Sequence, residues 1–409
     1  MEDIEVPEYF TCPISLQLMK DPVTSITGIT YDRENIEHWL FKGKNTTCPV
    51  TKQPLPRDSD LTPNHTLRRL IQAWCTENAA LGVDRIPTPK TPISKFHVIK
   101  LIKDLWRPQV DQIQTLRKLE ILAGENERNR KYMTEVGLPK AILTFLVTCF
   151  ERKSVVGLEE ALSILNFFRV PSGETKLLLI EIDRIIEALT WILGHEMEND
   201  FVIKSHALIV LKSIVSTASP GVLERLKPEL LQKIISVLRK GINQQGINAA
   251  LRVLLDACPS GRNKVLMVQS GAVFELIELE LSAPERRTTE LVLGILFHLC
   301  CCADGRAQFL SHKGGVAVVT KRILRVSPAS DDRAILILSL ISKFSTGNNS
   351  VFQEMVKVGT VMKLCKVLQA DSAAYLKDKA RGILRSHYEE WKDSPCINGS
   401  LITEFKIEN

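Results

Sequence analysis

A helical segment of similar length recurs through most of this chain, and it constrains the fold more than any other feature. Short turns anchor the recurrence at residues 137, 183, 229, 271, 314 and 359, which are spaced 46, 46, 42, 43 and 45 residues apart. Each interval holds Leu-, Ile- and Val-rich stretches such as residues 207–211 and 334–338. One such unit cannot bury its apolar face alone, so neighbouring units must stack. The sequence therefore predicts an all-α array of about six or seven repeats over residues 96–392.

The period and the turns resemble armadillo repeats. In that family we expect the turn glycine to relieve a sharp bend before the last, longest helix of each repeat. The stretches at 161–165, 207–211, 249–254 and 334–338 are then middle helices. An Asn- or Arg-bearing signature, as in Gly261-Arg262-Asn263, precedes several turns. The resemblance implies a curved solenoid whose concave groove is a recognition surface; an irregular helical bundle is the alternative.

The first 80 residues carry a different pattern, dense in turn signals. Thr27-Gly28 lies between two short β-rich stretches, which predicts a hairpin. Asp32 follows as an expected N-cap of a short helix with Trp39 on one face, and a second helix begins after Asn64. A small α+β domain is expected, containing in order the segments FTCPIS (10–15), DPV (21–23), GITYDR (28–33), CPVT (48–51) and LTPN (61–64).

The small number of candidate Cys and His ligands indicates that this domain folds without zinc. Two structural zinc ions need eight Cys or His ligands. The first 80 residues offer only Cys12, His38, Cys48, His65 and Cys75, with no Cys-x-x-Cys pair. Hydrogen bonds and ion pairs must then hold the loops. The polar groups available for this are those of Lys20, Asp21, Asp32, Arg33, Glu34 and Asn64.

The order of these segments resembles the U-box, a zinc-free relative of the RING finger. The resemblance implies that the domain docks a ubiquitin-charged conjugating enzyme (an E2) and speeds ubiquitin transfer to a substrate. It assigns the E2 contact to Ile14, Trp39 and Pro49, with Leu16 as a neighbour. Local packing of Ile14 and Pro49, and core filling by Trp39, are the alternatives.

The same resemblance gives roles to further residues of the domain. Lys52 lies where family members often carry an arginine that bridges ubiquitin and the E2, although lysine lacks arginine's planar fork of donors. A solvated surface lysine is the alternative. No cysteine is expected to carry ubiquitin covalently. The residues expected to be structural are Cys12, Asp21, Asp32, Arg33, Cys48 and Asn64.

Proline-rich residues 81–95 predict an extended linker between the U-box, assigned to residues 1–80, and the repeats. Thr88 and Thr91 precede prolines in this linker, as Thr62 does inside the U-box. All three are candidate phosphorylation sites. A phosphate at Thr62 would disturb packing beside the second helix or a self-association face. Residues 393–409 are expected to form a flexible tail.

Charge and composition narrow the classes of partner. The net charge is +6, but residues 1–80 hold 8 basic and 11 acidic side chains, and the basic excess of the remainder is spread out. We therefore expect no nucleic-acid partner.

No apolar run reaches the ~18 residues of a membrane span, and residues 1–5 are acidic, so we expect no secretory signal and a cytoplasmic or nuclear protein. The Cys300-Cys301-Cys302 run follows an apolar stretch and is expected in the core. No cofactor or metal is expected.

The order of U-box, proline linker and armadillo array resembles the plant U-box armadillo ubiquitin ligases, especially a subgroup linked to immune and water-stress signalling. The resemblance implies a mainly α chain that binds an E2 and ubiquitin through the U-box and a substrate protein through the solenoid. Related U-boxes often pair, so a homo- or hetero-oligomer is left open. The alternative function is a non-catalytic armadillo adaptor in which the U-box only dimerises.

Overall fold

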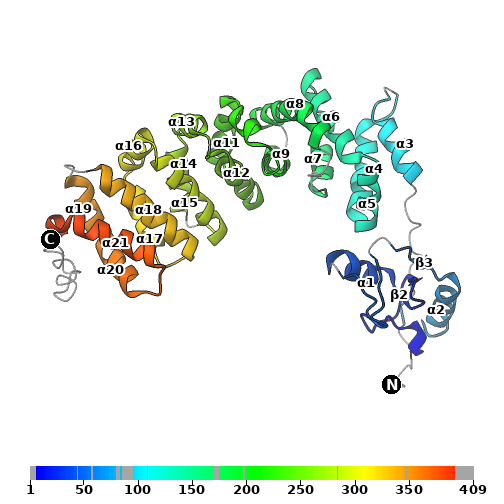
Figure 1. The fold of residues 1–409 in the computed structure, drawn as a ribbon. Helices are drawn as coiled ribbons and strands as arrows, with labels where there is room; N and C mark the ends of the chain where they lie inside the picture. Colours follow the sequence, from blue (N-terminus) through cyan, green and yellow to red (C-terminus); the bar gives the residue numbers. More distant parts are fainter. Residues whose placement is uncertain are drawn as a thin grey trace. The chain divides into compact units, whose positions relative to one another are not determined.

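The chain forms two compact units, Met1–Leu138 and Pro139–Asn409. The structure, a computed structural model, describes residues 6–43, 45–56, 59–79, 83–84, 95–107, 109–168, 175–196, 199–282, 284–345 and 349–391. The predicted linker sites Thr88 and Thr91 and the predicted tail at 393–409 lie outside the described residues. Figure 1 shows strands only near the N-terminus and helices in the rest of the chain.

A small antiparallel sheet organises the N-terminal part of the first unit. Strands β1 (Pro22–Thr24) and β2 (Thr30–Asp32) form the predicted hairpin, with Gly28 at φ 79° in its turn. Strand β3 (Thr62–Pro63) pairs with the other edge of β1, which gives the order β2-β1-β3. Residues far apart in the sequence are thereby joined at the centre of the domain.

Short helices flank this sheet. They are η1 (Glu8–Phe10), α1 (Arg33–Glu37), the π-helical turn η2 (His38–Lys42) and α2 (His65–Glu77). Asn64 caps α2, since its side-chain oxygen accepts the Leu67 N–H at 3.0 Å. The cap expected at Asp32 is not formed. Asp32 occupies the N-cap position of α1, but its Oδ1 accepts the N–H of Asp21 at 2.8 Å and so joins two distant loops instead.

Buried side chains from nearly every element of this domain meet in one core. Members include residues of η1, the sheet, α1, α2 and both intervening loops. Burial of this apolar surface supplies the main favourable term in folding. The core residues are Phe10, Cys12, Met19, Val23, Tyr31, Ile36, Leu40, Cys48, Leu55, Leu61, Ile71 and Cys75.

The rest of the first unit is helical. It comprises α3 (Lys95–Asp104), α4 (Gln112–Glu125) and α5 (Glu127–Glu135). Asp111 and Asn126 cap α4 and α5 by accepting backbone N–H groups three residues ahead.

The second unit repeats a pattern of three helices. The first helices are α10 (Pro220–Glu224), α13 (Gly261–Gln269), α16 (Ala303–Ser311) and α19 (Asn349–Lys357). The second helices are α6 (Leu138–Arg152), α8 (Thr175–Gly194), α11 (Pro228–Lys240), α14 (Ala272–Leu281), α17 (Gly315–Arg322) and α20 (Thr360–Gln369). The third helices are α7 (Leu158–Asn166), α9 (Asp200–Val215), α12 (Gln244–Ala257), α15 (Arg286–Cys300), α18 (Pro328–Phe344) and α21 (Ala374–Ser386), and α22 (Tyr388–Trp391) follows them.

These helices stack into two ladders, as expected of an armadillo array. Third helices contact one another in succession from α7 to α21, and second helices do so from α8 to α20. Each helix thus buries its apolar face against the neighbouring repeat. The predicted all-α armadillo solenoid is confirmed.

One expectation about the repeat is wrong. Gly271 and Gly359, at φ 80° and 79°, lie between the first and second helices, where a left-handed residue permits the sharp bend. The helices that follow them, α14 and α20, have only 10 residues each. In the last three repeats the longest helix is the third one, α15, α18 or α21, with 15, 17 and 13 residues, and the stretch 334–338 that the sequence placed in a middle helix belongs to α18.

The Asn- or Arg-bearing signature closes the end of the preceding third helix. The buried Asn263 amide donates to the Leu223 carbonyl at 2.7 Å and to the Ala257 carbonyl at 3.3 Å. Arg306 likewise donates to the Cys300 carbonyl at 2.9 Å. Helix ends leave their last carbonyls without partners, so these donors satisfy them where water is excluded.

The Cys300-Cys301-Cys302 run is only partly in the core. Cys300 is buried, Cys302 is half-buried and Cys301 is exposed, because α15 ends at Cys300 and the turn carries the next residue outward.

Within the described part of the chain no single helix is long and apolar enough to cross a membrane, although α5 and α6 taken together as a bent pair reach that length and composition.

Candidate functional site

Two loops of the U-box-like domain have the same backbone geometry. The first Cys-Pro loop (residues 12–17) and the second Cys-Pro loop (residues 48–53) have the sequences CPISLQ and CPVTKQ. In each, the N–H of the cysteine donates to the carbonyl of the glutamine at 2.8 Å, and the fifth residue donates back to the cysteine carbonyl. That fifth residue, Leu16 or Lys52, is left-handed, with φ 56° and 60°. The repeated pattern was visible in the sequence but was missed there.

The cysteine sulfur atoms hold these loops through hydrogen bonds. Cys12 Sγ accepts the N–H of Asp32 at 3.3 Å. Cys48 Sγ lies 2.9 Å from the Tyr31 hydroxyl and accepts the Thr27 hydroxyl and the Thr51 N–H, both at 3.3 Å. Strand β2 thus tethers both loops through sulfur.

The Cys48 thiol has an unusual acidity that the sequence did not suggest. Burial raises its pKa, but hydrogen bonds from Thr27, Thr51 and Tyr31 outweigh burial and lower the pKa to about 6. The sulfur is therefore mainly thiolate at neutral pH. Cys48 is nevertheless fully buried, so the thiolate cannot reach a bound ubiquitin ester.

A polar network joins Asp21, the residue directly before β1, to helices α1 and α2. Arg33 Nε lies 2.6 Å from Asp21 Oδ2, and its guanidinium also faces Glu37 at 3.6 Å. Arg68 of α2 approaches the other oxygen of Asp21 at 4.0 Å. Burial raises the pKa of the Asp32 carboxyl, although the hydrogen bond from the Asp21 N–H opposes this effect. Predicted structural residues 21, 32 and 33 thus lie together.

Asn64 lies beside the sheet and is joined to β1. Its backbone N–H donates to the Pro22 carbonyl at 2.8 Å, and its side-chain amide lies 3.5 Å from the Thr24 hydroxyl. Two of the other residues expected in the network act on Asp32: a backbone hydrogen bond from Lys20 lowers the pKa of its carboxyl, and the charge of Glu34 raises it.

The residues expected to contact an E2 differ in exposure. Leu16 is 78% exposed, whereas Ile14, Trp39 and Pro49 are half-buried. The Trp39 indole N–H donates to the Thr47 carbonyl at 2.9 Å, which holds the ring against the second Cys-Pro loop. Ile14 and Trp39 both pack on the domain core.

Two further positions complete this surface. Val50, which occupies the place of Ile14 in the second Cys-Pro loop, is 49% exposed and was missed by the sequence reasoning. The Lys52 ammonium folds back and donates to the Pro49 carbonyl at 2.9 Å. The surface therefore combines apolar side chains from both loops with one cation. Its E2-contact roles stay predictions, as do the structural assignments.

Thr62 lies exposed on β3, opposite Thr24 of β1. Its modification stays a prediction. No group of three or more His, Cys, Asp or Glu side chains in the described ranges is arranged to hold a metal ion.

Comparison with known proteins identifies the chain's family. A U-box domain profile matches residues 6–80, and a profile described as the plant U-box protein ARM repeat region matches residues 97–407. E3 ubiquitin-protein ligase PUB24 of Arabidopsis thaliana is 47% identical over 447 residues, which cover 98% of this chain and 96% of that protein. E3 ubiquitin-protein ligase PUB23 of the same plant is 41% identical over 409 residues, covering 99% and 98%.

A solved structure concerned with the interaction between cadherin and beta-catenin supports the fold. It has a TM-score of 0.61 at 13% identity and covers 81% of this chain and 60% of that chain. The chain belongs to the plant U-box proteins with an armadillo-repeat region. Within that family it is an E3 ubiquitin ligase of the U-box class, an enzyme of the RING type that works with an E2 partner and a protein substrate.

Proposed function

We propose that the two Cys-Pro loops and Trp39 hold the ubiquitin-charged E2 while the armadillo repeats hold the substrate. The observation that carries this assignment is the matched pair of loops, each rigidly closed and each presenting an apolar side chain. Trp39 is half-buried and lies among exposed apolar residues, an arrangement that is typical of a binding hot spot.

The chemistry of this arrangement is positioning. Cys12 and Cys48 are sealed in the core, so the U-box contributes no ubiquitin-carrying thiol. The E2 thioester is attacked directly by a substrate lysine. Tethering both partners to one chain raises their effective concentration, and a fixed orientation converts an encounter into an intramolecular step.

Single-turnover discharge of ubiquitin from a loaded E2 to free lysine tests the docking surface. Trp39→Ala and Leu16→Glu should each slow discharge by about 30-fold, the effect of losing roughly 2 kcal/mol of binding at a hot spot. Leu70→Ala, which alters an exposed apolar residue of α2 outside the loops, should change the rate by less than about twofold.

Measuring both Trp39→Ala and Leu16→Glu distinguishes a loss of E2 docking from a loss of folding. Leu16 is 78% exposed, so Leu16→Glu spares the core even if Trp39→Ala loosens it. Undiminished discharge in both variants would contradict the assigned surface. If the unaltered chain discharges none of a broad panel of E2 enzymes, the adaptor function gains support instead.

Lys52 is proposed to leave the Pro49 carbonyl and contact ubiquitin in the assembled complex. Its left-handed backbone and exposed ammonium support this assignment. In the same assay Lys52→Arg should match or exceed the unaltered chain and Lys52→Ala should fall below it, because only the cation bridges the two proteins. Equal rates would assign Lys52 to the solvated surface.

We further propose that the protein acts in the cytoplasm, also in the nucleus, and in plant immune and water-stress responses. Resemblance to the stress-linked subgroup supports the physiological part, and free thiols among the described cysteines suit a reducing compartment. Imaging of a tagged chain and the stress response of a loss-of-function plant test these two statements. Sedimentation of the full chain tests for an oligomer.

A further inference from the structure

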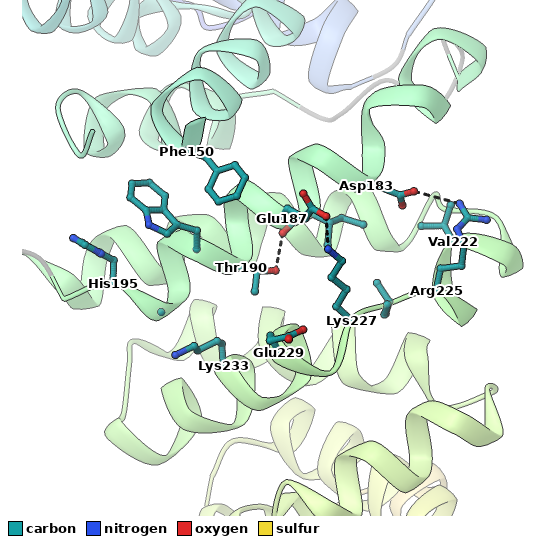
Figure 2. A pocket seen from close by; sticks show the side chains of 14 residues that line it. Phe150, Asp183, Glu187, Thr190, His195, Val222, Arg225, Lys227, Glu229 and Lys233 are labelled. Carbon is teal, nitrogen blue, oxygen red and sulfur yellow. Dashed lines mark hydrogen bonds and ion pairs between the residues drawn. The ribbon is translucent and has the colours of Figure 1, made fainter. Parts of the chain in front are cut away.

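A groove of about 640 Å³ lies on the second-helix ladder of the second unit (Figure 2). Its lining comes from α6, α8, α10 and α11, with α8 and α11 forming its long walls. No residue of a third helix lines it. The groove is therefore distinct from the third-helix face, and its size suits a few side chains of a peptide.

One end of the groove is aromatic. The rings of Phe150 and Trp191 lie 6.0 Å apart, and His195, the residue directly after α8, lies 5.3 Å from the Trp191 ring. Lys153 places its ammonium 4.0 Å from the centre of the Phe150 ring and 5.6 Å from that of Trp191. This end offers flat apolar surface with a cation already at its edge.

Charges elsewhere in the groove are largely compensated. Lys227 Nζ lies 2.5 Å from Glu187, and Arg225 lies 3.6 Å from Asp183, both across the gap between neighbouring repeats (Figure 2). Glu229 is the remaining lining carboxylate and acts electrostatically on Lys227. Two of these three carboxylates are thus ion-paired, and Glu229 keeps one negative charge in the described lining.

Two ammonium groups, one beside the Phe150 ring and one over Gly194, form no ion pair with a described residue. Lys153 and Lys233 are exposed, and neither has a carboxylate partner within ion-pair distance among the residues that the structure describes. The Lys233 chain crosses directly over Gly194, where an added Cβ would lie 2.9 Å from its Cε. Gly194 thus leaves room for the Lys233 side chain at the end of α8.

We propose that this groove binds an acidic peptide segment of a substrate protein, with one apolar side chain against Trp191 and neighbouring carboxylates paired with Lys153 and Lys233. The inference rests on the proposed function, because it makes the groove a substrate-recognition site. An apolar side chain fits the ring surface, and carboxylates supply the countercharge that the groove lacks. A basic segment would meet two like charges there.

Fluorescence anisotropy with the full-length chain tests the proposal. The probe is a fluorescein-labelled peptide Ser-Phe-Asp-Asp-Leu-Glu, and its matched counterpart carries lysine at each acidic position. The acidic peptide should bind more tightly. The double change Lys153→Glu with Lys233→Glu should weaken its binding by about tenfold or more, since two attractive contacts become repulsive.

Lys366→Glu is the matched control, because it reverses an exposed lysine on α20, a second helix far along the array. It should leave the affinity within about twofold. Both groove lysines are exposed, so their replacement spares the core, which circular dichroism verifies. Equal binding by the double variant, a preference for the basic peptide, or binding of an oligouridine probe in place of the peptide would overturn the proposal.

This outcome is independent of the E2 assay. Loss of peptide selectivity with normal ubiquitin discharge would remove the groove assignment and leave the proposed function standing. If the unaltered chain binds the peptide normally but discharges no E2, the proposed function would be removed and the groove assignment would stand.

Discussion

Cys48 shows how single residues replace a metal in this U-box. Its sulfur collects hydrogen bonds from a turn, a strand and its own loop, so one atom joins three segments. The neighbouring donors favour the thiolate, and burial raises the pKa of the Tyr31 phenol, which therefore stays protonated as a donor. Charge-assisted hydrogen bonds of this kind are stronger than neutral ones.

The pKa of Cys48 makes a pH-dependent contribution to stability. A folded pKa of about 6, below the ordinary thiol value of 9.0, means that the folded state releases its proton first. The contribution is therefore complete above pH 9.0 and is lost as the pH falls toward 6. Urea unfolding of the U-box under reducing conditions should show this loss. In Cys48→Ser the extra stability at high pH should disappear, and an identical pH profile in both proteins would contradict the assignment.

At the scale of elements, the Asn263 clamp explains why the repeats carry an Asn- or Arg-bearing signature. The side chain is fully buried and connects α13 to the ends of α10 and α12. It satisfies carbonyls that neither helix can pair internally. The signature is thus a means of closing one repeat against the next.

Removal of this clamp should weaken the second unit. Asn263→Ala should lower the free energy of unfolding by about 2–3 kcal/mol, because buried carbonyls lose their partners. Asn263→Asp should be worse, since a carboxylate donates nothing to a carbonyl. Gln245→Ala, at an exposed position of α12, should cost less than about 0.5 kcal/mol. Denaturant unfolding followed by circular dichroism compares the three variants, and a neutral Asn263→Ala would refute the clamp.

For the whole molecule, stability comes from hydrogen-bonded loops in the U-box and stacked helices in the repeats. The described residues contain no metal-ligand cluster, and both Cys-Pro loops are closed by backbone and sulfur hydrogen bonds. The U-box and the repeats thus bury their cores by different means.

Chelation should therefore leave the protein unaffected. Excess EDTA should change neither the thermal midpoint nor the rate of ubiquitin discharge, whereas a zinc-dependent domain loses its folding free energy when the metal is removed. The control is a zinc-containing RING ligase treated in parallel. A clear drop in the midpoint of this chain would show that the U-box was assigned to the wrong chemistry.

Much of the architecture could be predicted because its signals are local. The repeat period, the hairpin around Gly28 and the Asn64 cap each depend on residues near one another in the chain. The N-cap expected at Asp32 is wrong for the opposite reason. Its carboxylate instead accepts a hydrogen bond from the Asp21 N–H, which comes near only when the hairpin folds back.

The amino-acid order alone determined that a U-box precedes an armadillo array, because turn residues and apolar periodicity act through covalent neighbours. Only the tertiary structure decided that Cys48 receives donors from three segments, that Lys153 lies against the Trp191 ring and that Lys233 crosses over Gly194. Those arrangements depend on packing between segments separated by tens of residues, which local propensity does not encode.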